Sequence, residues 1–276
     1  MAPVRSTVLN VSFVIWTLGM ATTALVVAQF RGPETVRSYL QRWALGAQWL
    51  TRKTLNASFE VRGLDRFQNG DRPALIVCKH QSELDTFFPL ALYPDLAAIA
   101  MLELERYPLI GPIIRKLGYI LVSVEGAKSA QLRQVIEGSK RVHAEKRPIL
   151  IYPEGELMRI GSRHRYKSGV YHIYEALGCE ATPVALSCGL IWPQRRWTKR
   201  AHQTCVIEFM EPIPPGLDRV TFMREIEHRI ETRTMELIEE HGDAETIAIA
   251  RERHRLGLTN EDDVTVTDLQ KKPVDA

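Results

Sequence analysis

Residues 74–85 read ALIVCKHQSELD, an apolar run that ends in a charged and polar turn. The run at 74–78 is rich in residues that favour buried strands and carries no charge. Ser82 is a good helix-capping residue, so the stretch predicts a strand that turns into a helix. Such units are typical of α/β proteins, in which the carboxyl ends of strands carry functional groups.

Short apolar runs of the same kind alternate with helical patterns along the chain. Strands are also predicted at 97–101, 119–124, 148–152, 181–187 and 204–209, and helices at 82–92, 108–117, 127–145, 168–177 and 219–240. This alternation predicts an α/β fold with a mostly parallel central sheet flanked by helices. The four cysteines form no C-x-x-C pair, so we expect reduced core cysteines and no metal site.

The N-terminal region contains a long uncharged stretch, residues 8–30. A helix needs roughly 20 apolar residues to cross the hydrocarbon layer of a membrane. A signal peptide is the alternative, but the stretch is long for one, which favours an uncleaved transmembrane anchor. Five basic residues follow within 31–53 and Arg5 alone precedes it, so the positive-inside rule places the following domain on the cytoplasmic side of the inner membrane.

Residues 33–56 continue as a pattern of apolar residues interleaved with arginines. The spacing predicts an amphipathic helix, which would lie at the headgroup layer or pack against the following domain. Farther along, Trp192 and Trp197 stand among basic residues at 190–200, which predicts a membrane-facing loop.

His80 and Asp85 stand five residues apart in the strand-to-helix turn. A carboxylate that orients an imidazole makes the histidine a general base able to take the proton of an alcohol. The alternative is a structural histidine capped by a local carboxylate. The pair by itself leaves both interpretations open.

A second polar segment follows the predicted strand at 148–152. It begins with Tyr152-Pro153-Glu154-Gly155, in which the glycine permits a close approach of ligand to backbone. Basic residues come next and suit an anionic group, although charged loops are often simply solvated: Arg159, Arg163, His164, Arg165 and Lys167.

Three blocks of sequence, KHQSELD at 79–85, IYPEG at 151–155 and ATPVAL at 181–186, resemble in order and spacing those of the lysophosphatidic acid acyltransferase family. The resemblance implies the glycerolipid acyltransferase α/β fold. It also implies transfer of a fatty acyl group from acyl-CoA or acyl-carrier protein to the free hydroxyl of a lysolipid, first of all 1-acylglycerol-3-phosphate, giving phosphatidic acid. The implied partners are these two substrates and the bilayer, with no bound cofactor. A net charge of +3 gives no reason to expect nucleic acid.

The same resemblance assigns roles to individual residues. His80 would be the general base and Asp85 its partner, while Glu154 and Gly155 would belong to the acceptor site. The predicted substrate-binding set comprises Gln81, Ser82, Glu154, Gly155, Arg159 and Lys167. The expected division of the chain is an anchor at 1–32, an amphipathic helix at 33–56, a catalytic domain at 57–241 and a charged, flexible tail at 242–276.

The sequence departs from the family at two phosphate-binding positions. Ser123-Val124 stands where the family has Asp-Arg, and Glu156-Leu157 stands where it has Thr-Arg. Either Arg159 or Lys167 replaces the missing cations, or the acceptor carries an amine, as lyso-ornithine lipid does, and pairs with Glu156. Two further alternatives are a lipid hydrolase, which the absence of a G-x-S-x-G elbow disfavours, and a catalytically silent lipid-binding protein.

Overall fold

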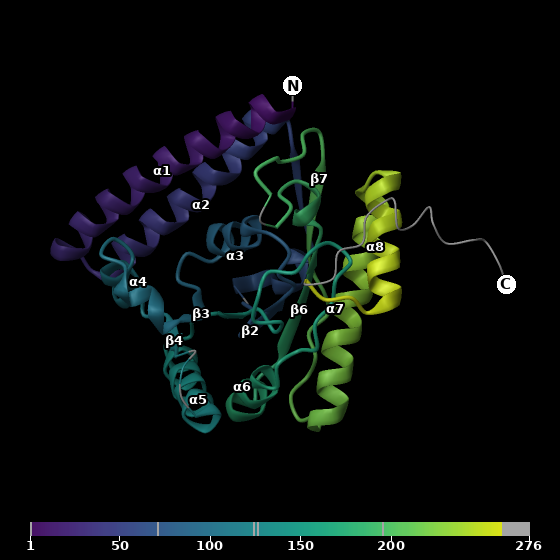
Figure 1. Cartoon of the computed structure of the whole chain (residues 1–276). Coiled ribbons are helices and arrows are strands. Elements are labelled where there is room, and N and C mark those ends of the chain that lie inside the picture. The colour runs from purple at the N-terminus through teal and green to yellow at the C-terminus, as the bar shows by residue number, and fades with distance from the viewer. Residues whose placement is uncertain (1, 71, 124, 126, 195, 261–276) are drawn as a thin grey trace.

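The computed structural model describes residues 2–70, 72–123, 125, 127–194 and 196–260 (Figure 1). In this part of the chain one sheet has the strand order β1-β7-β6-β2-β5-β3-β4. All neighbouring strands pair in parallel except β6 and β7, which are antiparallel. The strands are β1 (Ser58–Arg62), β2 (Leu75–Cys78), β3 (Ala97–Met101), β4 (Ile120–Val122), β5 (Ile149–Ile151), β6 (Ala181–Leu186) and β7 (Thr204–Phe209). The predicted mostly parallel α/β fold is confirmed.

Helices cover both faces of the sheet (Figure 1). They are α1 (Ala2–Phe30), α2 (Pro33–Leu55), α3 (Phe87–Leu92), α4 (Gly111–Leu117), α5 (Lys128–Ala144), α6 (Gly169–Leu177), α7 (Arg219–His241) and α8 (Ala244–Leu256), with short 3₁₀ turns η1 (Leu64–Gly70), η2 (Glu83–Thr86), η3 (Leu102–Arg106) and η4 (Cys188–Leu190). Because side chains alternate along a strand, β2 packs Ile76 and Cys78 against α2 and α3 and Leu75 and Val77 against the α5–α6–α7 side. The sheet is therefore buried on both faces.

Three loops meet at the carboxyl ends of the central strands. Strand β2 pairs in parallel with β6 on one side and β5 on the other. Their carboxyl ends consequently lie together, and the segments that follow them, beginning at Lys79, Tyr152 and Ser187, meet there. Pro183 lies in β6, as predicted, one of the strands that end at these loops.

Two elements differ from the sequence-based expectation. Strand β1 was not predicted, and the expected flexible tail at 242–276 is wrong for its first part, because residues 244–256 form helix α8. Asp243 caps this helix by accepting from the Thr246 N–H, and Gly257 ends it in the left-handed conformation. Thr246, Ala250 and Arg253 are buried. Residues 261–276 lie outside the described part of the chain.

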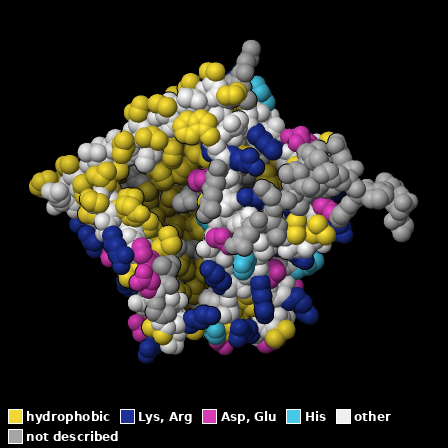
Figure 2. All heavy atoms as spheres, viewed as in Figure 1, with side chains coloured by type: hydrophobic (Ala, Val, Ile, Leu, Met, Phe, Trp, Pro, Cys, Tyr) yellow, Lys and Arg dark blue, Asp and Glu magenta, His cyan; other side chains and the backbone are white. Residues whose placement is uncertain are grey.

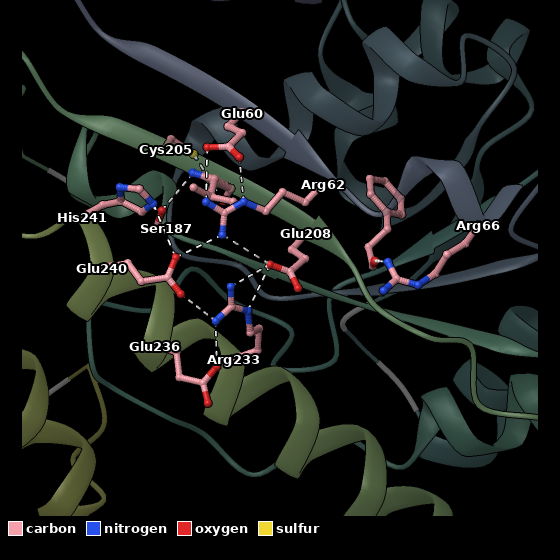
Figure 3. Close-up of polar contacts among 12 residues, drawn as sticks. Glu60, Arg62, Arg66, Ser187, Cys205, Glu208, Arg233, Glu236, Glu240 and His241 are labelled. Carbon is pink, nitrogen blue, oxygen red and sulfur yellow. Dashed lines mark hydrogen bonds and ion pairs between the residues drawn. The ribbon is translucent and has the colours of Figure 1, made fainter.

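An ion-pair network ties β1 to β7 and α7 (Figure 3). Arg233 of α7 reaches Glu208 of β7 at 2.9 Å and Glu240 at 2.8 Å, and Arg62 of β1 reaches Glu60 at 2.8 Å and Glu240 at 3.1 Å. Each pair is partly exposed and contributes at most about 1 kcal/mol, but the shared carboxylates link three elements. The network holds α7 at the β7 side of the sheet.

Helices α1 and α2 pack together as an antiparallel hairpin (Figure 1). The Trp16 indole donates to the Trp43 carbonyl, and the Trp43 indole donates to the Thr17 hydroxyl, both at 3.0 Å. Near its start, α1 also contacts the segment that precedes β7, where the Lys199 N–H donates to the Ser6 hydroxyl at 2.9 Å. Residues 3–30 are long and apolar enough to cross a membrane, and only 6% of their apolar window is buried.

The segment 190–200 differs in part from the predicted membrane-facing loop. Trp197 is exposed, and its indole donates to the Thr7 hydroxyl at 3.3 Å. Trp192 is buried instead, with the Lys199 ammonium 4.3 Å from the centre of its ring. Burial of this amine lowers the pKa of Lys199 to about 8.

Candidate active site

Asp85 and His80 form a hydrogen-bonded pair at the carboxyl end of β2. The Asp85 Oδ2 atom lies 3.2 Å from His80 Nδ1 and accepts from the N–H groups of Gln81 at 2.5 Å and Ser82 at 2.8 Å. The Ser82 hydroxyl in turn accepts from the Leu84 N–H at 3.1 Å, which completes a capping box around η2. Asp85 is fully buried, so its carboxylate is fixed and directs its charge at the imidazole. The predicted arrangement of this turn is present.

Tyr152 stacks on the His80 ring. The two ring centroids are 3.9 Å apart and the planes are inclined by 15°. The His80 side chain keeps 18% of its surface exposed. With Nδ1 turned to Asp85 and one ring face covered by Tyr152, Nε2 is the nitrogen left to take a proton from a substrate.

Glu154 does not face an acceptor, in contrast to the role that the family resemblance implies. Its side chain is fully buried, and Oε1 lies 3.2 Å from the Lys79 ammonium and 3.4 Å from the His80 N–H. Lys79 also lies 2.6 Å from Glu231 on α7, which accepts a hydrogen bond from the Tyr166 hydroxyl at 2.9 Å. A buried carboxylate needs such partners, because an unpaired charge in the interior is strongly unfavourable. Glu154, the acidic residue of the Glu-Gly turn, is thus a buried residue that pairs with Lys79 beneath the site.

Gly155 and Lys167 lie directly against each other. Gly155 has φ +75°, and a Cβ built on it would stand 2.1 Å from the Lys167 Nζ atom. The glycine therefore serves both the turn and the close approach of the ammonium. Lys167 is exposed, and it forms no ion pair with another described residue. It brings a positive charge to the Glu-Gly turn, where one of the two explanations for the missing arginines needs a cation.

Arg159 is half-buried in a loop that the C-terminal segment holds. Asn260 accepts from the Arg159 N–H at 2.8 Å and donates to the Leu157 carbonyl at 2.6 Å, and Arg253 of α8 donates to the Ser162 hydroxyl at 2.6 Å. These contacts hold the loop around Arg159 against the C-terminal segment. Sequence reasoning missed these contacts of residues 253–260 because it treated the segment as a tail.

The remaining predicted substrate-binding residues are buried. The Ser82 hydroxyl caps η2 by accepting from the Leu84 N–H. The Gln81 side chain is 1% exposed, and neither polar atom of its amide has a hydrogen-bond partner among the described residues. At the two positions where the family has arginine, Val124 lies outside the described residues and Leu157 is half-buried, while the neighbouring Glu156 is exposed.

Comparison with known proteins shows which family has this fold and this pair of residues. Residues 58–187, which include β1, the His80 turn and the Glu-Gly turn, match the model of the Acyltransferase family. This segment belongs to the acyltransferase family, and the named relatives below are lysophosphatidic acid acyltransferases.

Two relatives and one solved structure illustrate the similarity. The chain is 29% identical over 163 residues to a 1-acyl-sn-glycerol-3-phosphate acyltransferase of Pseudomonas aeruginosa, covering 59% of this chain and 62% of the relative. It is 25% identical over 136 residues to a chloroplastic enzyme of the same name from Arabidopsis thaliana, covering 48% and 37%. The chain therefore spans less than two thirds of these relatives. The crystal structure of the 1-acyl-sn-glycerophosphate acyltransferase PlsC of Thermotoga maritima has the same fold, with a TM-score of 0.67, 21% identity and coverage of 86% of this chain and 98% of that one.

Proposed function

We propose that the chain transfers a fatty acyl group from acyl-CoA or acyl-carrier protein to the free hydroxyl of 1-acylglycerol-3-phosphate. The observation that carries this proposal is the His80–Asp85 pair, whose buried carboxylate orients the ring and leaves Nε2 for the acceptor. The names of the Pseudomonas and Arabidopsis relatives support the choice of acceptor.

The reaction follows from the position of His80. Its Nε2 removes the proton of the acceptor hydroxyl while the hydroxyl oxygen attacks the carbonyl carbon of the acyl thioester. The negative charge of Asp85 stabilises the imidazolium that forms. The C–S bond then breaks, and the imidazolium returns its proton to the leaving thiolate. The products are the new ester and the free thiol of the carrier, and no protein nucleophile is needed.

The surface near the site has room for apolar chains. Figure 2 shows a hollow with hydrophobic walls on the face viewed, beside α3 and β3 and above α6 as labelled in Figure 1. Lysine and arginine side chains lie on both sides of this hollow, most of them to its right (Figure 2). An apolar hollow beside cations suits a lipid, because the hollow can hold its acyl chains and the cations can bind its anionic headgroup.

Lys167 is proposed to bind the phosphate of the acceptor. The change Lys167→Gln should raise KM for lysophosphatidic acid about 10-fold or more, because a charge-assisted hydrogen bond to phosphate contributes about 1.5–3 kcal/mol. The value of kcat at saturating acceptor should change little. Steady-state kinetics of the purified variant test this prediction. Arg165→Gln, an exposed cation of the same loop, is the matched control, and an equal rise in KM for both variants would contradict a specific role of Lys167.

Glu156 favours a second candidate acceptor. It is exposed at the turn where the family has a threonine, and a carboxylate there suits an amine rather than a phosphate. A lyso-aminolipid such as lyso-ornithine lipid would meet this requirement. In that case Glu156→Gln should raise KM for the aminolipid and leave or improve the use of lysophosphatidic acid.

Membrane attachment is proposed to occur through the outer surface of the α1–α2 hairpin. Figure 2 shows hydrophobic side chains over this hairpin. The exposed ones are Val4, Val8, Val11, Val14, Ile15, Leu18, Val26, Phe30, Leu45 and Trp49. The start of α1 contacts Lys199 and its other part contacts α4, so a helix lying along the domain, in one leaflet of the cytoplasmic membrane, agrees better with these contacts than a spanning anchor does.

Vesicle flotation tests the membrane proposal. The double change Leu45→Ser and Trp49→Ser removes two exposed apolar side chains from α2 and should lower the vesicle-bound fraction at least several-fold, because burial of apolar area drives interfacial binding. The pair Val220→Ser and Leu256→Ser, exposed on α7 and α8, is the control and should bind like the unchanged chain. Equal binding by both double variants would refute attachment through the hairpin.

A further inference from the structure

Three elements meet at one buried ammonium beside the site. The Lys79 Nζ atom lies 2.6 Å from Glu231 of α7 and 3.2 Å from Glu154 of the β5–α6 loop. It also donates to the Ser162 carbonyl at 3.4 Å. The three charged side chains are 1%, 7% and 0% exposed, respectively, so they interact with one another and hardly with water. Tyr166 adds a hydrogen bond to the same oxygen of Glu231.

The two carboxylates keep Lys79 charged. Burial by itself lowers the pKa of Lys79, but Glu231 and then Glu154 outweigh burial, and the net shift is upward. Burial raises the pKa of Glu154, Lys79 opposes this, and Glu231 adds to it as a second negative charge. The ammonium is the group that both carboxylates share, and the position of each acid depends on it.

This cluster is connected directly to the backbone of His80. Lys79 immediately precedes His80 in the chain, and Glu154 accepts from the His80 N–H. The carbonyl of His80 accepts from the Met158 N–H at 2.6 Å. Both backbone groups of the histidine are therefore held by the β5–α6 loop. The ion pair with Glu231 fixes the position of the Lys79 ammonium, and the ammonium in turn fixes the position of the Glu154 carboxylate.

We propose that Glu231 is a positioning residue for His80, acting through Lys79 and Glu154; this inference rests on the proposed transferase function. Glu231 lies on α7, outside the segment 58–187 that matches the family model. Its carboxylate holds the end of β2 and the Glu-Gly loop in register, so that His80 Nε2 and the bound acceptor meet at reacting distance. A misplacement of about 1 Å at such a site lowers the rate about 100-fold.

The change Glu231→Gln tests this role, because it keeps the shape of the side chain and removes its charge. We expect kcat to fall about 10-fold to 100-fold while KM for both substrates stays within about twofold, since Glu231 contacts neither substrate. Glu231→Asp restores the carboxylate and should recover part of kcat. Glu236→Gln removes an exposed carboxylate from the same helix, outside the buried cluster, and should keep nearly the full rate. Circular dichroism and thermal unfolding establish the folded fraction to which each kcat refers.

Two results would overturn the proposal. One is a kcat of folded Glu231→Gln equal to that of the unchanged chain. The other is an Asp variant no better than the Gln variant together with a raised KM, which would indicate a general loss of structure. Lack of transfer by the unchanged chain would instead contradict the proposed function, so the two failures are distinguishable.

Discussion

Replacing His80 with alanine is expected to lower the rate of acyl transfer by about 10³-fold, because a general base contributes about 10²–10⁴-fold. The imidazole is the group that Asp85 and Tyr152 together orient, and its Nε2 is the only base that the proposed mechanism uses. The side chain is partly exposed, so its loss should leave the fold intact. Single-turnover transfer of a labelled acyl group measures the chemical step directly.

The change His164→Ala is the matched control for His80. His164 is exposed in the basic loop, and its removal should change the rate by less than about twofold. A His80→Ala variant that is folded and retains more than about a tenth of the rate would contradict the role of His80 as the base.

The change Asp85→Asn should lower kcat by about 10²–10⁴-fold, because general-base catalysis contributes about that much and loss of the charge behind a catalytic histidine can cost about 10⁴-fold. The Oδ2 atom of Asp85 makes the contacts to His80, Gln81 and Ser82. An asparagine can place its carbonyl oxygen there and keep the geometry of the turn. The variant therefore isolates the contribution of the negative charge to the imidazolium.

Ser82→Ala is the control for Asp85→Asn, because it alters the same turn without altering its charge. Loss of the cap should cost about 1 kcal/mol of stability and leave the rate within a few-fold of normal. Equal kinetic effects of the two variants would show that the turn matters only for folding. A nearly normal kcat for Asp85→Asn would contradict the proposed mechanism.

Most of the sheet could be predicted from the sequence because its strands are buried on both faces. Six apolar runs predicted β2 to β7, and helices α3 to α7 were placed to within a few residues. Strand β1 was not predicted because it is an edge strand whose five residues include the charged Glu60 and Arg62, so it forms no apolar run. Its pairing partner and its ion pairs are distant in sequence. Helix α8 was missed because its second half is largely charged and only a few of its positions are buried.

The site was only partly predictable. His80 and Asp85 are close in sequence, so the local turn predicts their contact. Glu231 is one glutamate among several in α7, and its contact with Lys79 requires tertiary structure. A signal was present, because Glu231 follows Ile230 and precedes Ile238 by seven residues, which places it on the buried face of the helix. For Glu154, the resemblance implied an acceptor contact, whereas burial and Lys79 give it another role.

The most direct test is the transfer of a labelled acyl group from acyl-CoA or acyl-carrier protein to lysophosphatidic acid by the purified chain, beside a lyso-aminolipid and the His80→Ala control. The predicted result is phosphatidic acid that forms only with intact His80. Product from the aminolipid alone would contradict the phosphate acceptor and favour an acceptor amine that pairs with Glu156. No His80-dependent product from either lipid would contradict the transferase proposal and favour a lipid-binding protein.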